Sequence, residues 1–305
     1  MNCDLCKRRE AFYRRIHEGL ALCKICFKSN VEKKVKRTIS KYRMFNPDDH
    51  IAVALSGGKD SLALLTILNK LEKKFPHSKI TAITVDEGIE GYRDEAIKLA
   101  KECCSSLNVD HLTVSFKELF GVELDEIVKF KENLSPCAYC GVLRRRAIDK
   151  AAKMIKATKI ATAHNLDDEA QTALLNLFNG DIARMARTEP VLKDPEGKFL
   201  VRVKPLCEVM EKEIALYAYL KGIEFQSISC PYVTTSLRND IRNMLNRLDE
   251  RHPGVKYVVY HSAQKIRDSL KATLEKIELR NCRFCGEVTT NEVCGVCKMI
   301  KNLSK

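Results

Sequence analysis

The segment that most restricts the fold of this chain runs from residue 51 to 61 and reads Ile-Ala-Val-Ala-Leu-Ser-Gly-Gly-Lys-Asp-Ser. Its first five residues have the apolar character of a buried strand, and Gly57 and Gly58 let the backbone turn tightly and approach a ligand closely. A helix that starts directly after such a turn presents unsatisfied N–H groups and the positive end of its dipole. The spacing matches neither Gly-x-x-x-x-Gly-Lys-Ser/Thr nor Gly-x-Gly-x-x-Gly. We therefore expect a phosphate-binding strand–turn–helix unit of a different kind.

From residue 50 onward, apolar runs of strand length alternate with amphipathic helical segments. This alternation predicts an α/β fold with a doubly wound parallel sheet, in which ligands bind beyond the carboxyl ends of the strands. We expect strands at 51–55, 80–85, 111–114 and 159–163, and helices at 60–73, 93–107, 141–156, 167–179 and 210–220.

Two further polar segments follow strands of this predicted sheet. Asp86 ends the second strand, where its carboxylate is placed to accept hydrogen bonds from ribose hydroxyls. His164, Asp167 and Asp168 follow a later strand and start a helix. Two adjacent acids beside a phosphate site suit Mg²⁺ binding or proton transfer. The alternatives are a generic strand-ending role for Asp86, helix capping by Asp167 or Asp168, and a structural role for His164.

Cysteine pairs occupy both ends of the chain. Each pair has the Cys-x-x-Cys form, and 16 residues separate the N-terminal pairs while 8 separate the C-terminal ones. Four thiolates close a tetrahedral shell on Zn²⁺ and leave no open position, so we predict two structural zinc sites. Their ligands are Cys3, Cys6, Cys23 and Cys26 at one end and Cys282, Cys285, Cys294 and Cys297 at the other. The expected units are zinc modules at 1–30 and 280–305, a linker helix within 31–49 and a catalytic domain at 50–279.

A separate set of cysteines lies within the predicted catalytic domain. Cys137 and Cys140 precede a predicted helix and three arginines, and both features favour thiolate. Cys230 stands far along the chain, before a proline. Three thiolates are one short of the usual four for an iron–sulfur cluster, which leaves one iron free for another ligand. A thiol/disulfide pair and a persulfide carrier are equally compatible with the spacing. Cys103, Cys104 and Cys207 are expected to pack in the core.

The amino-acid composition indicates which kind of molecule the chain binds. The chain carries a net charge of +13, gathered at 7–9, 33–37, 144–146 and 238–251, and such clusters suit a polyanion. A solvated basic surface without a partner is the alternative. Trp is absent and aromatic residues make up 7%, so we expect a structured RNA bound through its backbone and shape, not base stacking. No stretch approaches the roughly 20 apolar residues of a membrane helix, and residues 1–6 lack a signal-peptide core, so we expect a cytoplasmic protein without membrane contact.

Taken together, these features resemble the tRNA 2-thiolation enzymes of the TtcA/TtuA superfamily, whose nucleotide loop is the PP-loop of ATP pyrophosphatases. The resemblance covers nearly the whole chain and is greatest to the branch of archaeal NcsA and eukaryotic cytosolic wobble-uridine thiolases. The motifs that carry it lie at 56–61, 84–93, 140–145, 163–169 and 230–232. The sister TtuA branch, which thiolates a T-loop uridine, usually has a lysine after its second central cysteine, where this chain has Arg144.

The resemblance implies a two-part reaction. ATP, with Mg²⁺, would adenylate the C2 oxygen of a uridine, and sulfur would then displace AMP. It implies a [4Fe–4S] cluster on Cys137, Cys140 and Cys230, and catalytic roles for Asp167, Asp168 and Arg144. The implied nucleotide site comprises Ala54, Ser56, Gly57, Gly58, Lys59, Asp60, Ser61, Asp86 and His164. The implied partners are tRNA, a second copy of the chain, and a sulfur donor that is sulfide, a desulfurase persulfide or a ubiquitin-like thiocarboxylate carrier.

Several alternatives remain at the level of sequence. One is thiolation of the T-loop uridine, and another is a persulfide mechanism in place of the cluster. A PP-loop ligase or amidotransferase would not need Cys137, Cys140 and Cys230. A zinc-knuckle RNA-binding protein with a nucleotide-sensing PP-loop is the non-enzymatic alternative.

Overall fold

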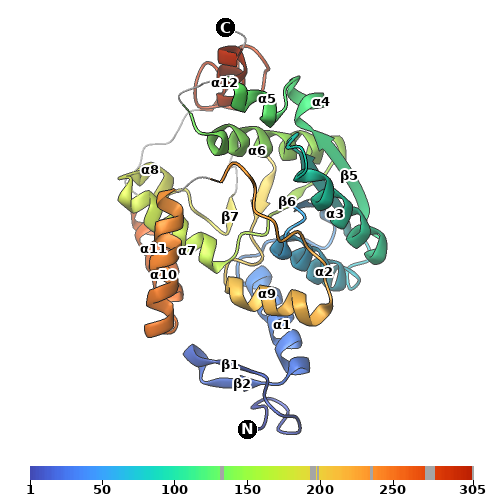
Figure 1. The fold of residues 1–305 in the computed structure, drawn as a ribbon, viewed down its shortest axis with the longest axis vertical. Coiled ribbons are helices and arrows are strands. Elements are labelled where there is room, and N and C mark those ends of the chain that lie inside the picture. The colour runs from blue at the N-terminus through green and yellow to red at the C-terminus, as the bar shows by residue number, and fades with distance from the viewer. Residues whose placement is uncertain (131–133, 193–196, 198, 234–235, 272–278, 304–305) are drawn as a thin grey trace.

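A six-stranded sheet forms the centre of the chain in the computed structural model, which describes residues 1–130, 134–192, 197, 199–233, 236–271 and 279–303 (Figure 1). The strand order is β5-β4-β3-β6-β8-β7, and all neighbours are parallel except β7 and β8. The strands are β3 (His50–Leu55), β4 (Lys79–Asp86), β5 (Asp110–Ser115), β6 (Lys159–Ala161), β7 (Val191–Leu192) and β8 (Val201–Val203). The predicted doubly wound fold is confirmed, with one antiparallel strand at its edge.

Helices cover both faces of this sheet because its central strands are apolar on both sides. Ile51 and Val53 of β3 pack in one core cluster, whereas Ala52 between them packs in the other. The first core includes α1 (Lys24–Lys41), α2 (Lys59–Glu72), α3 (Arg93–Leu107) and α9 (Glu211–Lys221). The second includes α4 (Phe116–Phe120), α5 (Leu124–Lys129), α6 (Pro136–Met154) and α12 (Gly295–Leu303). A lateral group consists of α7 (Leu166–Phe178), α8 (Ile182–Met185), α10 (Leu237–Arg251) and α11 (Val255–Lys271).

The order of the strands fixes where a ligand can bind. From β3 the chain builds β4 and β5 on one side and then returns to place β6 on the other side of β3. The connections that leave β3 and β6 therefore diverge, and ligands of open α/β sheets bind at such a switch point, beyond the carboxyl ends of the strands. The loop at 56–58 and the segment at 162–168 both emerge there.

The two cysteine-rich modules lie at opposite ends of the molecule's long axis (Figure 1). The N-terminal one contains the hairpin of β1 (Tyr13–Arg15) and β2 (Leu20–Leu22), joined by the 3₁₀ turn η1 (Ile16–Glu18). The C-terminal one contains β9 (Arg280–Asn281), β10 (Val288–Thr289) and α12. A buried ion pair of 2.5 Å between Arg15 and Glu213 of α9 anchors the first module to the catalytic core.

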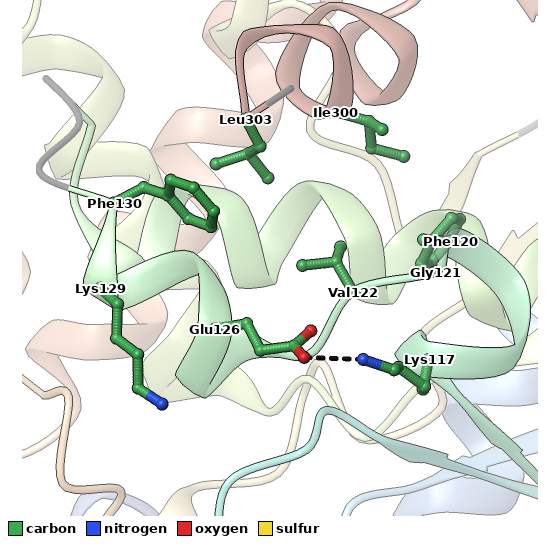
Figure 2. Close-up of a pocket in the computed structure, with 9 residues that line it drawn as sticks. All are labelled: Lys117, Phe120, Gly121, Val122, Glu126, Lys129, Phe130, Ile300 and Leu303. Carbon is green, nitrogen blue, oxygen red and sulfur yellow. Dashed lines mark hydrogen bonds and ion pairs between the residues drawn. The ribbon is translucent and has the colours of Figure 1, made fainter. Parts of the chain in front are cut away.

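The C-terminal module packs against α6 and borders a pocket of about 490 Å³. Phe120, Phe130 and Leu303 line its apolar part, and Lys117 and Glu126 form an ion pair of 2.7 Å at its edge (Figure 2). Neither the loop at 56–61 nor a cysteine lines this pocket. It is therefore separate from the switch point of the sheet.

Three elements differ from the sequence-based prediction. The helix expected within 31–49 begins at Lys24, and its Phe27 and Val31 are fully buried, so it belongs to the core and is not an exposed linker. Helix α6 begins at Pro136 instead of residue 141, which places the central cysteine pair inside the helix. Helix α10 (Leu237–Arg251) coincides with the basic cluster predicted at 238–251, and α11 (Val255–Lys271) lies where we predicted no helix or strand. None of the described helices has the length and apolarity to cross a membrane.

Candidate functional site

The loop between β3 and α2 has the geometry of an anion-binding turn. Gly57 has φ +82°, and a Cβ atom there would lie 2.6 Å from that of Ala96, so only glycine fits. The Ser56 hydroxyl accepts a hydrogen bond from the Gly58 N–H (3.3 Å), and Ser61 Oγ donates to the Gly58 carbonyl (2.9 Å). Ala54 lies in β3, opposite Ile83 of β4, and is partly exposed. The serines thus fix the turn while α2 starts at Lys59.

Lys59 is held by carboxylates from two elements. Its Nζ lies 2.9 Å from Asp60 and 2.7 Å from Glu211 at the start of α9. Arg242 of α10 donates two hydrogen bonds of 2.6 Å to the same Glu211 carboxylate. Burial would raise the pKa of Glu211, but these cations lower it, so it is ionised at neutral pH. No local motif in the sequence marks Glu211, and Arg242 was noted only as part of the basic cluster at 238–251.

The start of α7 brings a second acid to the loop. Asn165 caps the helix, and Asp168 completes the capping box, since each side chain accepts from the other's backbone N–H at 3.0–3.1 Å. Asn165 also donates to Asp60 (3.3 Å). Burial raises the pKa of Asp168 to about 6, and nearby Asp60 contributes to the rise. The pKa of Asp60 is likewise raised, chiefly by burial. Two neighbouring carboxylates with raised pKa values are hard to ionise together. A cation bound between them would stabilise their ionised forms.

The Asp167 carboxylate has other partners than that of Asp168. One carboxylate oxygen pairs with the buried Lys256 Nζ of α11, and the other accepts from the Glu211 N–H at 2.8 Å. Its side chain is therefore directed toward α9 and α11. Neither Asp167 nor Asp168 is the N-cap residue, which is Asn165.

His164 and Asp86 occupy the same edge of the sheet. His164 Nδ1 lies 2.9 Å from Thr162 Oγ1, and the His164 side chain is exposed to solvent. Partial desolvation by the surrounding protein and the charge of Lys204 lower the pKa of His164 to about 4, so its imidazole is neutral at pH 7. Asp86 accepts a hydrogen bond from the Gly88 N–H (2.9 Å) and closes the turn after β4.

Residues of the central cysteine set come from two segments. Ser135 caps α6 and Pro136 takes its first position, which places Cys137 and Cys140 in the first two turns. Cys137 Sγ lies 3.5 Å from the Tyr232 carbonyl, and Tyr232 in turn donates to Asp125 (2.7 Å), so the segment around Cys230 lies against α6. Cys140 is buried in the apolar cluster that Cys230 and Tyr232 also contact.

Burial and the nearby charge of Arg144 act in opposite directions on the Cys140 thiol. Burial raises the pKa of Cys140 to about 11, although the charge of Arg144 acts in the opposite direction. Arg144 Nη2 lies 3.1 Å from its sulfur. Metal coordination would replace the proton of such a thiol and hold it as thiolate.

The spacing of the sulfur atoms separates two kinds of metal site. In the described part of the chain, only the two terminal sets bring four cysteine sulfurs within 4.8 Å of one another. Such closeness suits a single Zn²⁺ ion. Cys137, Cys140 and Cys230 do not form such a set, although Cys140 and Cys230 meet in one apolar cluster and Cys137 lies against the Tyr232 carbonyl. Three cysteines would leave one iron of a [4Fe–4S] cluster without a protein ligand.

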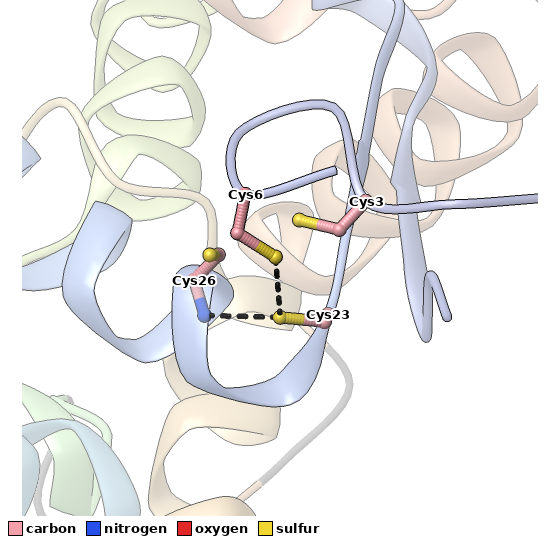
Figure 3. A group of neighbouring side chains, drawn as sticks. All are labelled: Cys3, Cys6, Cys23 and Cys26. Atoms are coloured by element: carbon pink, nitrogen blue, oxygen red, sulfur yellow. Dashed lines mark hydrogen bonds between the residues drawn. The ribbon is translucent and has the colours of Figure 1, made fainter. Parts of the chain in front are cut away.

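Both terminal sets fit zinc in their hydrogen bonding as well. Cys6 and Cys23 have their sulfurs 3.9 Å apart, and the Cys26 N–H lies 3.5 Å from the Cys23 sulfur (Figure 3). In the C-terminal set, the Cys294 N–H donates to the Cys282 sulfur at 3.3 Å, and backbone donors lower the pKa of Cys282 to about 6. Of the other cysteines, Cys104 and Cys207 are buried and Cys103 is partly buried.

The three consecutive arginines differ in their contacts. Arg144 pairs with Glu87 (2.6 Å) and Arg146 with Glu287 (2.9 Å). Arg145 has no ion pair within the described residues, and burial together with the charges of Arg202 and Arg184 lowers its pKa. Of the three, Arg145 is the one available for an external phosphate.

This fold and loop define a PP-loop protein, and a family model of the PP-loop domain matches residues 27–248. The tRNA 2-thiolation protein NcsA of Haloferax volcanii is 37% identical over 99% of both chains. Cytoplasmic tRNA 2-thiolation protein 1 of Dictyostelium discoideum is 35% identical over 99% of this chain and 83% of its own. The solved structure of the U34-tRNA thiolase NcsA from Methanococcus maripaludis with its [4Fe–4S] cluster superposes with a TM-score of 0.87, at 35% identity over 99% of this chain and 96% of that one.

Within the PP-loop proteins, the chain belongs to the tRNA 2-thiolation family of NcsA and cytoplasmic tRNA 2-thiolation protein 1. The resemblance inferred from sequence is thereby confirmed.

Proposed function

We propose that this protein is a tRNA uridine 2-sulfurtransferase that acts on the wobble uridine. The observation that carries the proposal is that one folded core holds both a PP-loop and, outside the two terminal sets, three cysteines brought together from two segments. Full-length similarity to a U34-tRNA thiolase supports the choice of uridine. ATP, Mg²⁺ and tRNA are the expected ligands.

In the first chemical step, the uridine C2 oxygen attacks the α-phosphate of ATP and pyrophosphate leaves. The N–H groups of Gly57, Gly58 and the first turn of α2 are placed to stabilise the negative charge that develops on phosphate. Lys59 supplies a positive charge at a position fixed by Glu211. Asp60 and Asp168 are the carboxylates placed to hold Mg²⁺ against the phosphates.

The second step replaces the activated oxygen. A nucleophilic sulfur attacks C2, the C2–O bond breaks and AMP departs with both electrons of that bond, which leaves 2-thiouridine. A [4Fe–4S] cluster held by Cys137, Cys140 and Cys230 would supply an iron that binds this sulfur. The Arg144 guanidinium lies beside the Cys140 sulfur, where it favours an anionic ligand.

The remaining assignments complete the proposal. We assign one Zn²⁺ to each terminal cysteine set, with the two modules at 1–30 and 280–305 flanking the catalytic domain. We place the protein in the cytoplasm, in line with the name of its Dictyostelium relative, and we expect it to act as a homodimer. Arg145 contacts the tRNA backbone. Sulfide, a desulfurase persulfide and a ubiquitin-like thiocarboxylate are the donors to compare.

Replacement of the central cysteines tests the function. In cells that carry only the Cys137→Ala/Cys140→Ala/Cys230→Ala protein, we expect nucleoside mass spectrometry to find no wobble 2-thiouridine. Cys103→Ala is the matched control, because Cys103 lies in α3, against the other core cluster, and its replacement is expected to leave thiolation intact. Thiolated wobble uridine in the triple variant would exclude the cluster mechanism, and its appearance at the T-loop would exclude the wobble assignment.

A further inference from the structure

Glu87 is a buried carboxylate that joins two arginines at the carboxyl end of β4. It is 1% exposed, and its two oxygens lie 2.5 Å from Arg93 Nε and 2.6 Å from Arg144 Nε. A buried carboxylate is stable in a protein only when its charge is compensated in this way. Each arginine also contacts a second group, and these groups belong to different parts of the proposed active site.

Arg93 connects Glu87 to the nucleotide loop. Its Nη1 donates to the Ser56 carbonyl (3.0 Å), and its Nη2 donates to the Val85 carbonyl (2.6 Å). The Ser56 carbonyl and the Gly57 N–H belong to one planar peptide group and point in opposite directions. By holding that carbonyl, Arg93 sets the direction in which the Gly57 N–H faces a phosphate.

Arg144 connects Glu87 to the central cysteines. It uses Nε for the Glu87 carboxylate and Nη2 for the Cys140 sulfur at 3.1 Å. The planar guanidinium therefore fixes the relative position of the carboxylate and the sulfur. A continuous series of contacts runs from Ser56 through Arg93, Glu87 and Arg144 to Cys140.

We infer that Glu87 is a positioning residue that couples nucleotide binding at the PP-loop to the metal state of Cys140. A phosphate that accepts a hydrogen bond from the Gly57 N–H reorients the Ser56–Gly57 peptide group, whose carbonyl Arg93 holds. Because Arg93 and Arg144 share the Glu87 carboxylate, this change is transmitted to Arg144. Coupling between two sites is reciprocal, so cluster loading must change nucleotide affinity by the same factor. This inference rests on the proposed function, in which both sites serve one reaction.

The affinity for α,β-methylene ATP tests the coupling, because this analogue resists cleavage between its α and β phosphates. Its Kd is measured by calorimetry before and after anaerobic reconstitution of the full chain with iron and sulfide. The quantity of interest is the ratio of the two Kd values. A structural role for Glu87 would change both Kd values by the same factor, whereas loss of coupling changes their ratio.

Three variants are compared with the wild type. In Glu87→Gln, the amide presents an acceptor to only one arginine. In Arg144→Lys, the charge remains but the planar fork is lost. Because the Arg144 side chain is 44% exposed and that of Glu87 only 2%, we expect Arg144→Lys to disturb folding less than Glu87→Gln. Glu213→Gln is the matched control, because Glu213 is also buried between two cations, Arg15 and Lys34, that lie on the N-terminal part of the chain.

We expect a Kd ratio of about fivefold or more in the wild type and in Glu213→Gln, and a ratio close to one in the other two variants. A wild-type ratio of one, or a wild-type ratio preserved in both Glu87→Gln and Arg144→Lys, overturns the inference. Equal loss in Glu213→Gln also overturns it. The same wild-type preparation is assayed for 2-thiouridine in tRNA, so absent thiolation with intact coupling contradicts the proposed function alone.

Discussion

Replacing Asp168 by asparagine is expected to stabilise the Mg²⁺-free protein while abolishing its activity. Burial raises the pKa of Asp168 from 3.8 to about 6; the Asn165 N–H lowers it, and Asp60 adds to the rise. This difference corresponds to about 3 kcal/mol of destabilisation in the ionised form. Because Asp168 is only partly buried, solvent screening reduces the effect, and we expect Asp168→Asn to gain about 1–2 kcal/mol at pH 7.5. The amide oxygen still accepts the hydrogen bond from Asn165.

The sign of the pH dependence follows from the raised pKa. Between pH 4 and 6 the folded protein binds a proton at Asp168 that the unfolded chain has released, so stability falls as pH rises through this range. Above pH 6 the full penalty is present in the wild type. The gain in Asp168→Asn is therefore largest above pH 6 and decreases as pH falls toward 4.

Thermal unfolding followed by circular dichroism between pH 5 and 8 measures this effect. In Mg²⁺-free buffer, we expect the Tm of Asp168→Asn to exceed that of the wild type by about 1.5–3 °C at pH 7.5. Asp181→Asn is the control, because Asp181 also caps a helix but is expected to show no such gain. A lower Tm for Asp168→Asn, or a gain that does not change with pH, would refute the reasoning.

Three further predictions concern the loop, the buried ion pair and the zinc sites. Gly57→Ala introduces about 2 kcal/mol or more of strain at φ +82° and is expected to weaken ATP binding at least about tenfold by calorimetry; unchanged affinity would contradict the loop geometry. Lys256→Met leaves Asp167 buried without a cation and is expected to lower the free energy of unfolding by about 3–5 kcal/mol in urea titrations, whereas a neutral effect would show that Asp167 is not paired. Cys23→Ser is expected to reduce bound zinc from two ions to one per chain by mass spectrometry and to expose residues 1–30 to proteolysis; retention of both ions would contradict the N-terminal site.

The parts of the fold that depend on local sequence were predictable. The loop at 56–61 and the terminal cysteine pairs are defined by residues within a few positions of one another, and the structure places each as expected. The start of α6 could also have been predicted, since Ser135 followed by Pro136 is a typical sequence at a helix N-terminus. We instead predicted that this helix starts at residue 141, after the two cysteines.

The contacts that give each acid its role were not predictable, because they join distant segments. Lys59 meets Glu211 across 152 positions in the chain, and Asp167 meets Lys256 across 89. Sequence alone presents Asp167 and Asp168 as equivalent neighbours. Only the packing of α9 and α11 against α7 separates them, by pairing Asp167 and leaving Asp168 beside Asp60.

The central claim is that ATP activation and a cysteine-bound cluster act together on the wobble uridine. The most direct test incubates the reconstituted protein anaerobically with ATP, Mg²⁺, sulfide and unmodified tRNA, and then maps thiolated nucleosides by mass spectrometry of tRNA fragments. We predict 2-thiouridine at the wobble position, with one AMP released for each, and none without ATP or with the Cys230→Ala protein. Thiolation that persists without ATP, or no new thiolated nucleoside in the complete reaction, would contradict the account.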